Sequence, residues 1–195
     1  MRRSAIVIGT VLACASARVH AQASLRANTR HGVWIGLGLG DGLAGLDCAY
    51  SCADGRIGGV SGYFRLGATL SPSILIGAEA NGWLRSDAGV DYSMESASVV
   101  VLWYPNRTGA LYLKGGLGGL RYREWDGVDE TTATAPSASL GIGYEVRLGR
   151  NLSLVPFLNT LASSAAQIRL NTVPVTTGEE LSVTLLQFGV GVTWH

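Results

Sequence analysis

The sequence holds five charged residues that share one kind of position: each stands among mostly small or polar residues on one side of an alternating segment. They are Arg65, Glu79, Lys114, Glu145 and Arg147. In a sheet, alternate residues face the same side, so these charges would gather on one face. Such a group could line a polar pore or gate. It could instead form a plug of salt bridges, since charges removed from water must be paired or solvated. We favour the plug.

One pair in this group can be placed by counting. Arg65 lies seven residues before Pro72 and Glu79 seven residues after it, within a predicted hairpin. Residues directly opposed on adjacent strands have Cβ atoms about 4.5–5.5 Å apart, so we expect these two side chains to form an ion pair. Glu145 and Arg147 are two residues apart, so both face the same side of their predicted strand, close to the tight turn predicted at 149–151.

Cys48 and Cys52 are the only cysteines outside the predicted signal peptide. An exported protein meets an oxidising compartment, so a disulfide within the first loop is expected. A metal site would need further ligands, but the remaining histidines, His31 and His195, lie near the opposite end of their strands. We therefore predict a Cys48–Cys52 disulfide and no metal site.

Enzyme activity finds little support in these residues. A nucleophilic mechanism needs a base such as histidine beside the nucleophile. His31 begins the first predicted strand and His195 ends the last, which places both at one end of the fold. Glu79 and Glu145 could act as an acid–base pair, but basic neighbours explain them more simply. We predict that the protein is not an enzyme and has no cofactor.

The elements that must position these residues are strands. In the segment 182–195, every second residue from Leu186 to Trp194 is large and apolar, which indicates a strand with one apolar face. Residues 31–40 show the same alternation and are the expected partner, which would close the sheet into a barrel and remove both edges. Alternation predicts further strands at 57–70, 74–84, 92–104, 110–122, 137–148 and 152–162. Which residues of 92–104 face outward stays undecided, because residues 99–102 are all apolar.

The predicted connections alternate in length. Residues 71–73, 105–109 and 149–151 form tight turns, whereas 41–56, 85–91, 123–136 and about 163–181 are longer and polar. Most of the acidic residues fall in the longer connections, where they either keep loops solvated or hold divalent cations against lipid phosphates. Short turns at one end and longer loops at the other are typical of outer-membrane barrels. The fold class predicted is all-β: an eight-stranded antiparallel up-and-down transmembrane β-barrel.

Residues 1–23 have the features of a signal peptide. Arg2 and Arg3 precede a short apolar stretch, and Ala21-Gln22-Ala23 fits a cleavage site, which leaves residues 24–195 as the barrel. Lipidation at Cys14 is the alternative. The remaining sequence has no basic patch of the kind that binds nucleic acid.

These features together resemble the small bacterial outer-membrane barrels of the OmpA/OmpX type, without a periplasmic domain. The resemblance implies a location in the outer membrane, contact with lipid and lipopolysaccharide, and recognition of the C-terminal strand by the outer-membrane assembly machinery. In such families an aromatic residue usually comes last, whereas here Trp194 is followed by His195. Trp194, with Trp103 or Tyr104, is expected to form an aromatic girdle at the periplasmic interface.

We therefore expect a structural or interaction role, with surface-exposed loops, a charge-plugged lumen and an external partner that the sequence does not name. A narrow porin-like channel for water or small solutes is the alternative. A secreted lipocalin-like binder is a third possibility, because Gly32-Val33-Trp34 matches the opening of lipocalins. Lipocalins fill their interior with apolar side chains, however, and here the inward face is expected to be mostly glycine, serine and charge.

Overall fold

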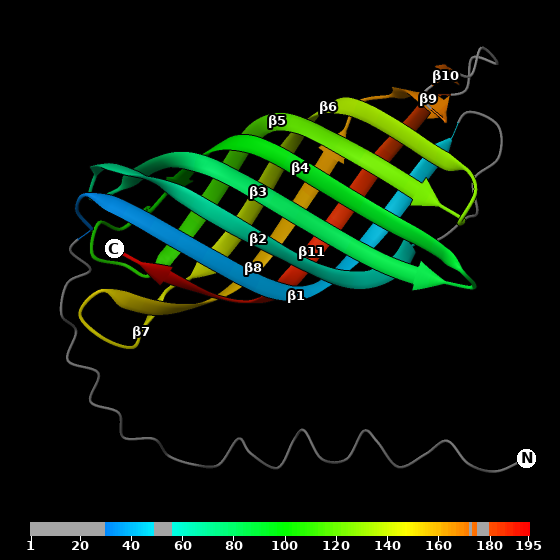
Figure 1. Cartoon of the computed structure of the whole chain (residues 1–195). Coiled ribbons are helices and arrows are strands. Elements are labelled where there is room, and N and C mark those ends of the chain that lie inside the picture. The colour runs from blue at the N-terminus through cyan, green and yellow to red at the C-terminus, as the bar shows by residue number, and fades with distance from the viewer. Residues whose placement is uncertain (1–29, 49–55, 172, 175–179) are drawn as a thin grey trace, which may run out of the picture.

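The described strands of the computed structural model form one closed antiparallel barrel (Figure 1). The structure describes residues 30–48, 56–171, 173–174 and 180–195. The signal peptide predicted at 1–23 lies outside these residues. The strands are β1 (Val33–Cys48), β2 (Arg56–Ser71), β3 (Ile74–Asp87), β4 (Val90–Trp103), β5 (Leu111–Trp125), β6 (Glu130–Tyr144), β7 (Val146–Arg147), β8 (Leu152–Ser163), β9 (Ala166–Leu170), β10 (Val173–Pro174) and β11 (Glu180–Trp194).

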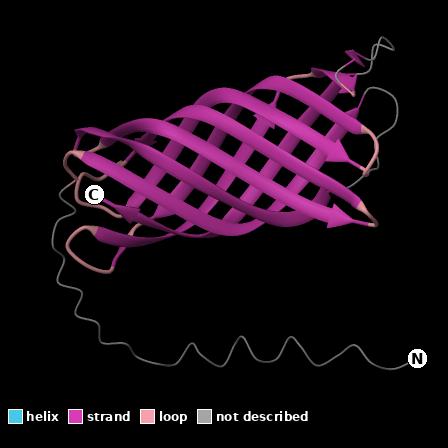
Figure 2. Ribbon diagram, viewed as in Figure 1, coloured by secondary structure: helices cyan, strands magenta, loops and turns pink. Residues whose placement is uncertain are grey.

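The barrel closes where the sequence predicted, between its first and last strands. β11 pairs with β1 from Trp194 opposite Ile35 to Leu181 opposite Cys48. β7 pairs with β8 and so continues the line of β6, while β9 pairs with both β6 and β11 and continues the line of β8. The barrel wall therefore has eight strands, and the predicted fold class is confirmed. Strands are the regular elements throughout the described ranges (Figure 2), and these contain no helix that is long and apolar enough to cross a membrane.

The two ends of the barrel differ. One end, here called the base, holds the turns at 72–73 and 104–110, β7 and the C-terminal residue His195 (Figure 1). The other end carries β9, β10 and the turn at Ala88-Gly89. We call the part of the barrel near this second end, beyond Asp41 on β1, Glu95 on β4, Arg121 on β5 and Thr134 on β6, the extension.

Large apolar side chains cover the outside of the barrel from the base upward. Leu39 on β1 and Leu117 on β5 are 73% and 72% exposed, values that no folded protein maintains over a whole surface in water. The facing left open for β4 is resolved, since Val99 and Val101 point outward and Val100 is buried. At the base, Trp103 and Trp194 lie on the outside, whereas Tyr104 is fully buried.

The apolar belt ends at a level that four strands of the wall show. The first polar outward residues are Asp41 on β1, Glu95 on β4, Arg121 on β5 and Thr134 on β6. Leu111 and Arg121 are ten residues apart on β5, which at about 3.4 Å per residue and a tilt of about 40° gives a belt of about 26 Å. That height matches the roughly 25 Å apolar band of outer-membrane barrels.

Above the belt the strands continue, and the expectation of long loops was wrong for two of the four predicted there, 85–91 and 123–136. The predicted loop 85–91 is strand apart from Ala88 and Gly89, whose positive φ values of 50° and 87° form a two-residue hairpin turn. The predicted loop 123–136 reduces to 126–129 between β5 and β6, and β1 includes residues 41–48. Polar outward side chains alone do not indicate a loop, because strand pairing depends on the backbone and continues above the apolar belt.

The interior of the extension also differs from the prediction. Instead of glycine, serine and charge, it holds an apolar cluster that includes Trp83, Met94, Leu120, Tyr122 and Leu185. Outside the belt the barrel wall faces water, so apolar side chains are stable only on the inside. Lower in the barrel, inward glycines make room for larger groups: a Cβ on Gly38 would collide with the ring of Tyr63.

Candidate functional site

The lumen within the belt contains a buried ionic layer centred on Glu79. This residue lies on β3 directly opposite Arg65 on β2, in the register that the sequence count predicts, and the two side chains form an ion pair. Both are 2% exposed. Because each belongs to the inward face of its strand, neither charge can reach lipid or bulk water.

Glu79 has further partners on two strands. Lys114 Nζ, from β5, donates to Oε1 at 2.7 Å and to Oε2 at 2.9 Å. Asn81 Nδ2 donates to Oε1 at 2.8 Å. The carboxylate therefore compensates two buried cations and is the centre of the layer.

The contacts of Arg65 extend the layer across the lumen. Its Nη1 donates to the hydroxyl of Tyr112 on β5 at 3.1 Å, and its Nη2 lies 3.5 Å from Asn159 Oδ1 on β8. The guanidinium also stacks on the ring of Tyr63, with its central carbon 3.7 Å from the ring centroid. The interactions of Arg65 thus join β2 to strands on the opposite wall.

A second ionic layer closes the base around Glu145. Arg30 donates to Oε2 from Nη2 at 2.9 Å and from Nε at 3.3 Å. The hydroxyl of Tyr104 donates to Oε1 at 2.6 Å, and Nε2 of His195 lies 3.2 Å from the same oxygen. Four separate parts of the chain therefore meet at one buried carboxylate.

Arg30 also binds the turn between β4 and β5. Its Nη2 donates to the carbonyl of Gly109 at 2.7 Å, and its guanidinium stacks 3.5 Å from the ring centroid of Tyr104. Arg30 is 1% exposed although it precedes the first strand. Its position outside the alternating segments explains why the sequence pattern did not identify it.

The five predicted charges thus divide between two places. Arg65, Glu79 and Lys114 meet in the middle layer. Glu145 lies apart from them, in the base layer, where it contacts Arg30 and His195. Arg147 lies in β7 at the base and is only partly buried. Cys52 lies outside the described residues, so the Cys48–Cys52 disulfide stays a prediction.

Apolar side chains fill the lumen around and above the layers. A cluster near the base includes Trp34, Leu75, Val100 and Val155 with Tyr104 and Tyr112, the tyrosines that contact the two charged layers. The larger cluster of the extension lies above. No group of three or more potential metal ligands comes together within the described ranges.

Comparison with known proteins adds information on the fold. No protein-family model matches the sequence, and no curated protein matches it. The structure is similar to that of Neisserial surface protein A, with a TM-score of 0.56 and 14% identity over 85% of this chain and 98% of that one. It is also similar to Ail, the attachment invasion locus protein of Yersinia pestis, with a TM-score of 0.55 and 12% identity over 85% of this chain and all of that one. A second structure of Ail, in complex with the heparin analogue sucrose octasulfate, gives a TM-score of 0.54 at 11% identity. At these identities the likeness concerns the fold, and by fold the chain is a small eight-stranded barrel of the outer-membrane type.

Proposed function

We propose that the protein resides in the outer membrane and has a structural or interaction role at the cell surface, with a lumen closed to solutes. The observation that carries this proposal is the pair of ionic layers that cross the lumen at Glu79 and Glu145. A solute passing through would have to separate buried charges from their partners at both levels. Leaving a buried charge unpaired costs about 3–5 kcal/mol, so neither layer opens readily.

The extension supports the interaction role. Its strands are paired and its interior is apolar, so it is an ordered part of the barrel that projects beyond the apolar belt. The base then faces the periplasm and the extension faces outward, as the short turns at 72–73 and 149–151 suggest. Ail shows that a protein of this fold has been obtained in complex with a heparin analogue. We infer that the extension is the part that meets external partners.

We assign the protein no catalytic role. His195 contacts Glu145 at the base, and His31 is exposed at the same end, remote from the extension. Contact with lipopolysaccharide, and recognition of β11 by the assembly machinery, belong to the same proposal. Lipid contact rests on the apolar belt, and recognition of β11 rests on its outward row of apolar residues that ends at Trp194.

A narrow water-conducting channel is the second candidate. Several buried polar atoms in the lumen have no hydrogen-bond partner among the described residues, among them Tyr63 Oη, Asn159 Nδ2 and Gln187 Nε2. Such atoms could bind water between and above the charged layers. They favour hydration of the lumen but do not open either layer.

Conductance in planar bilayers separates the two candidates. We expect the wild-type protein to insert without producing stable conductance steps, and Arg30→Ala to do the same, because the Glu79 layer still blocks the lumen. Insertion is checked independently by the change in gel mobility between unboiled and boiled samples. Uniform steps from the wild type, altered in size by Glu79→Gln, would support the channel and refute the closed lumen.

A further inference from the structure

The Glu79 layer holds more positive charge than negative charge. Arg65 and Lys114 both pair with Glu79, so two cations share a single carboxylate. In the base layer, by contrast, Arg30 faces Glu145 and the charges of this pair cancel. These five side chains are the buried charged groups of the described ranges, so no second buried carboxylate there balances the Glu79 layer. One positive charge in the lumen is therefore left without a compensating charge.

Lys114 is the cation that can take a further partner. Its ammonium group has three N–H donors, and two of them are used by Oε1 and Oε2 of Glu79. Lys114 is 3% exposed and lies on the inward face of β5 within the apolar belt, so bulk water does not reach the third donor. A charge kept from water in this way needs a counter-charge.

Two amide donors without a partner lie in the same row of the barrel wall as Lys114. Gln187 pairs with Asn159, Asn159 with Gly141, and Gly141 with Lys114, which joins β11, β8, β6 and β5. Asn159 Nδ2 and Gln187 Nε2 have no hydrogen-bond partner among the described residues, and both side chains are buried. A Cβ on Gly141 would collide with Asn159 Oδ1 and lie 3.2 Å from Lys114 Cε, so these two side chains meet over the glycine. The hydroxyl of Ser139, the next inward residue of β6, is also without a partner.

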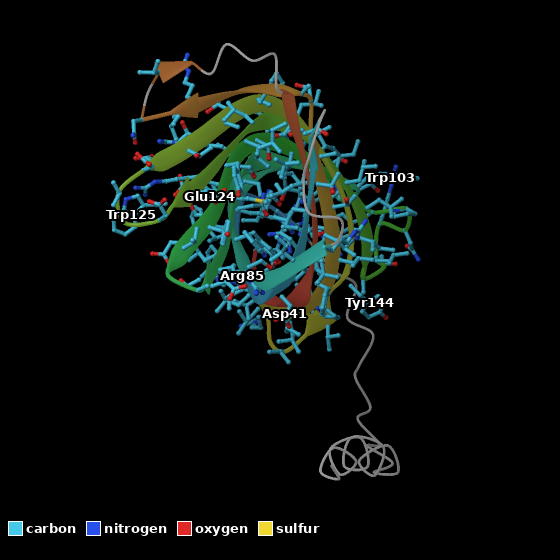
Figure 3. The ribbon with its side chains drawn as sticks, turned by 90° about the vertical axis from the view of Figure 1, so that its right-hand side faces the viewer. Asp41, Arg85, Trp103, Glu124, Trp125 and Tyr144 are labelled. Carbon is cyan, nitrogen blue, oxygen red and sulfur yellow. The ribbon has the colours of Figure 1, made fainter. Side chains whose placement is uncertain are left out.

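This set of donors fits a small anion better than it fits water. Water could satisfy the amides and the hydroxyl, but it would leave the positive charge uncompensated. Figure 3, which views the barrel from the extension, shows an interior crowded with side chains. Room for a ligand must therefore come from rotation of the long side chains of Lys114 and Gln187, and this limits the ligand to the size of a single atom.

We propose that the lumen binds one chloride ion above the Glu79 layer. The ion accepts hydrogen bonds from Lys114 Nζ, Asn159 Nδ2 and Gln187 Nε2, and its charge balances the second cation of the layer. Chloride thereby becomes part of the structure that closes the lumen. This inference goes beyond the proposed function, because it does not depend on any external partner of the extension.

The first test measures unfolding of the mature chain in lipid vesicles while chloride replaces gluconate, an anion too large for the site, at constant ionic strength. A ligand that binds only the folded state lowers the equilibrium constant for unfolding in proportion to its concentration, once this exceeds the dissociation constant. We therefore expect the constant to fall about tenfold for each tenfold increase in chloride. Lys114→Met should remove this dependence, because Arg65 and Glu79 then form a balanced pair. Arg121→Met is the matched control: it removes an exposed cation from the same strand, so the dependence should remain.

The second test locates the ion by the anomalous X-ray scattering of bromide, in crystals grown with bromide in place of chloride. We expect an anomalous peak inside the lumen beside Lys114 Nζ, and no such peak in Lys114→Met. A peak confined to the outer surface would indicate an adventitious ion only and would overturn the proposal. Unfolding that is equal in chloride and in gluconate would overturn it too, whether water fills the site or Lys114 has lost its proton. Stable conductance of the wild type would refute the closed lumen by itself, so the two proposals fail separately.

Discussion

Removal of the Glu79 carboxylate is the change to which the barrel should be most sensitive. Glu79 compensates both Arg65 and Lys114 in a part of the lumen where each is at most 3% exposed. Glu79→Leu would leave two cations buried without an anion. We expect it to lower the free energy of unfolding by about 3–5 kcal/mol, the usual effect of an uncompensated buried charge.

The other members of the layer should respond unequally. Arg65→Met leaves Glu79 with Lys114 and Asn81, so it should cost only about 1–3 kcal/mol, the usual range for a lost charge-assisted hydrogen bond. Replacing Arg65, Glu79 and Lys114 together by apolar residues removes every unpaired charge. That triple variant should be more stable than Glu79→Leu alone, because apolar replacements of a whole buried ionic group are often neutral.

Urea unfolding in lipid vesicles, followed by the fluorescence of the five tryptophans, measures these differences. Glu130→Leu is the matched control, since Glu130 also meets two arginines, Arg121 and Arg123, but at the exposed surface of the extension. Exposed ion pairs contribute about 0–1 kcal/mol, so this variant should barely change the unfolding midpoint. Additive losses in the cycle of Arg65→Met and Glu79→Leu, or equal losses for the two, would refute the role of Glu79 as the shared partner.

Three further predictions concern the base and the sidedness of the barrel. Arg30→Met should leave Glu145 buried with only Tyr104 and His195 as the partners seen here, and should increase hydrogen exchange at the turn 104–110 while exchange in the extension stays unchanged. Trp194→Ala should slow insertion into vesicles, measured by the gel-mobility shift over time, because an aromatic residue anchors this end of β11 at the interface. An epitope inserted after Asp126 should be labelled by antibody on intact cells and one at Arg107 should not; the reverse pattern would invert the orientation.

The inward and outward faces were predictable from the sequence because a membrane barrel repeats one simple alternation. Val60 outward and Glu79 inward follow directly from it, and the register of Arg65 with Glu79 follows from one tight turn. The facing of residues 99–102 could not be predicted, because the lumen is apolar near Val100 and both faces of β4 carry the same kind of residue there.

The remaining errors have two physical origins. Whether a side chain is polar depends on which side of the barrel wall it faces and on whether lipid, water or the lumen lies there. Strand pairing, in contrast, is formed by backbone hydrogen bonds. The polarity pattern therefore predicts Arg121 at the end of a strand and Arg123 in a loop, although β5 continues to Trp125. The contacts of Arg30 depend on where the chain enters the base, and this entry follows from tertiary structure alone.

The change of interior along the barrel axis follows from what lies outside the wall. Inside the membrane, lipid chains are as apolar as leucine, so apolar packing alone would not decide which face of a strand turns inward. A slip of one residue would carry Arg65 and Glu79 into lipid, and the cost of exposing such charges there fixes the register. Above the belt, water opposes exposure of Trp83 and Leu185, and an apolar interior is sufficient. The ionic layers therefore lie at the levels of the barrel where the hydrophobic effect cannot specify which face of a strand points into the lumen.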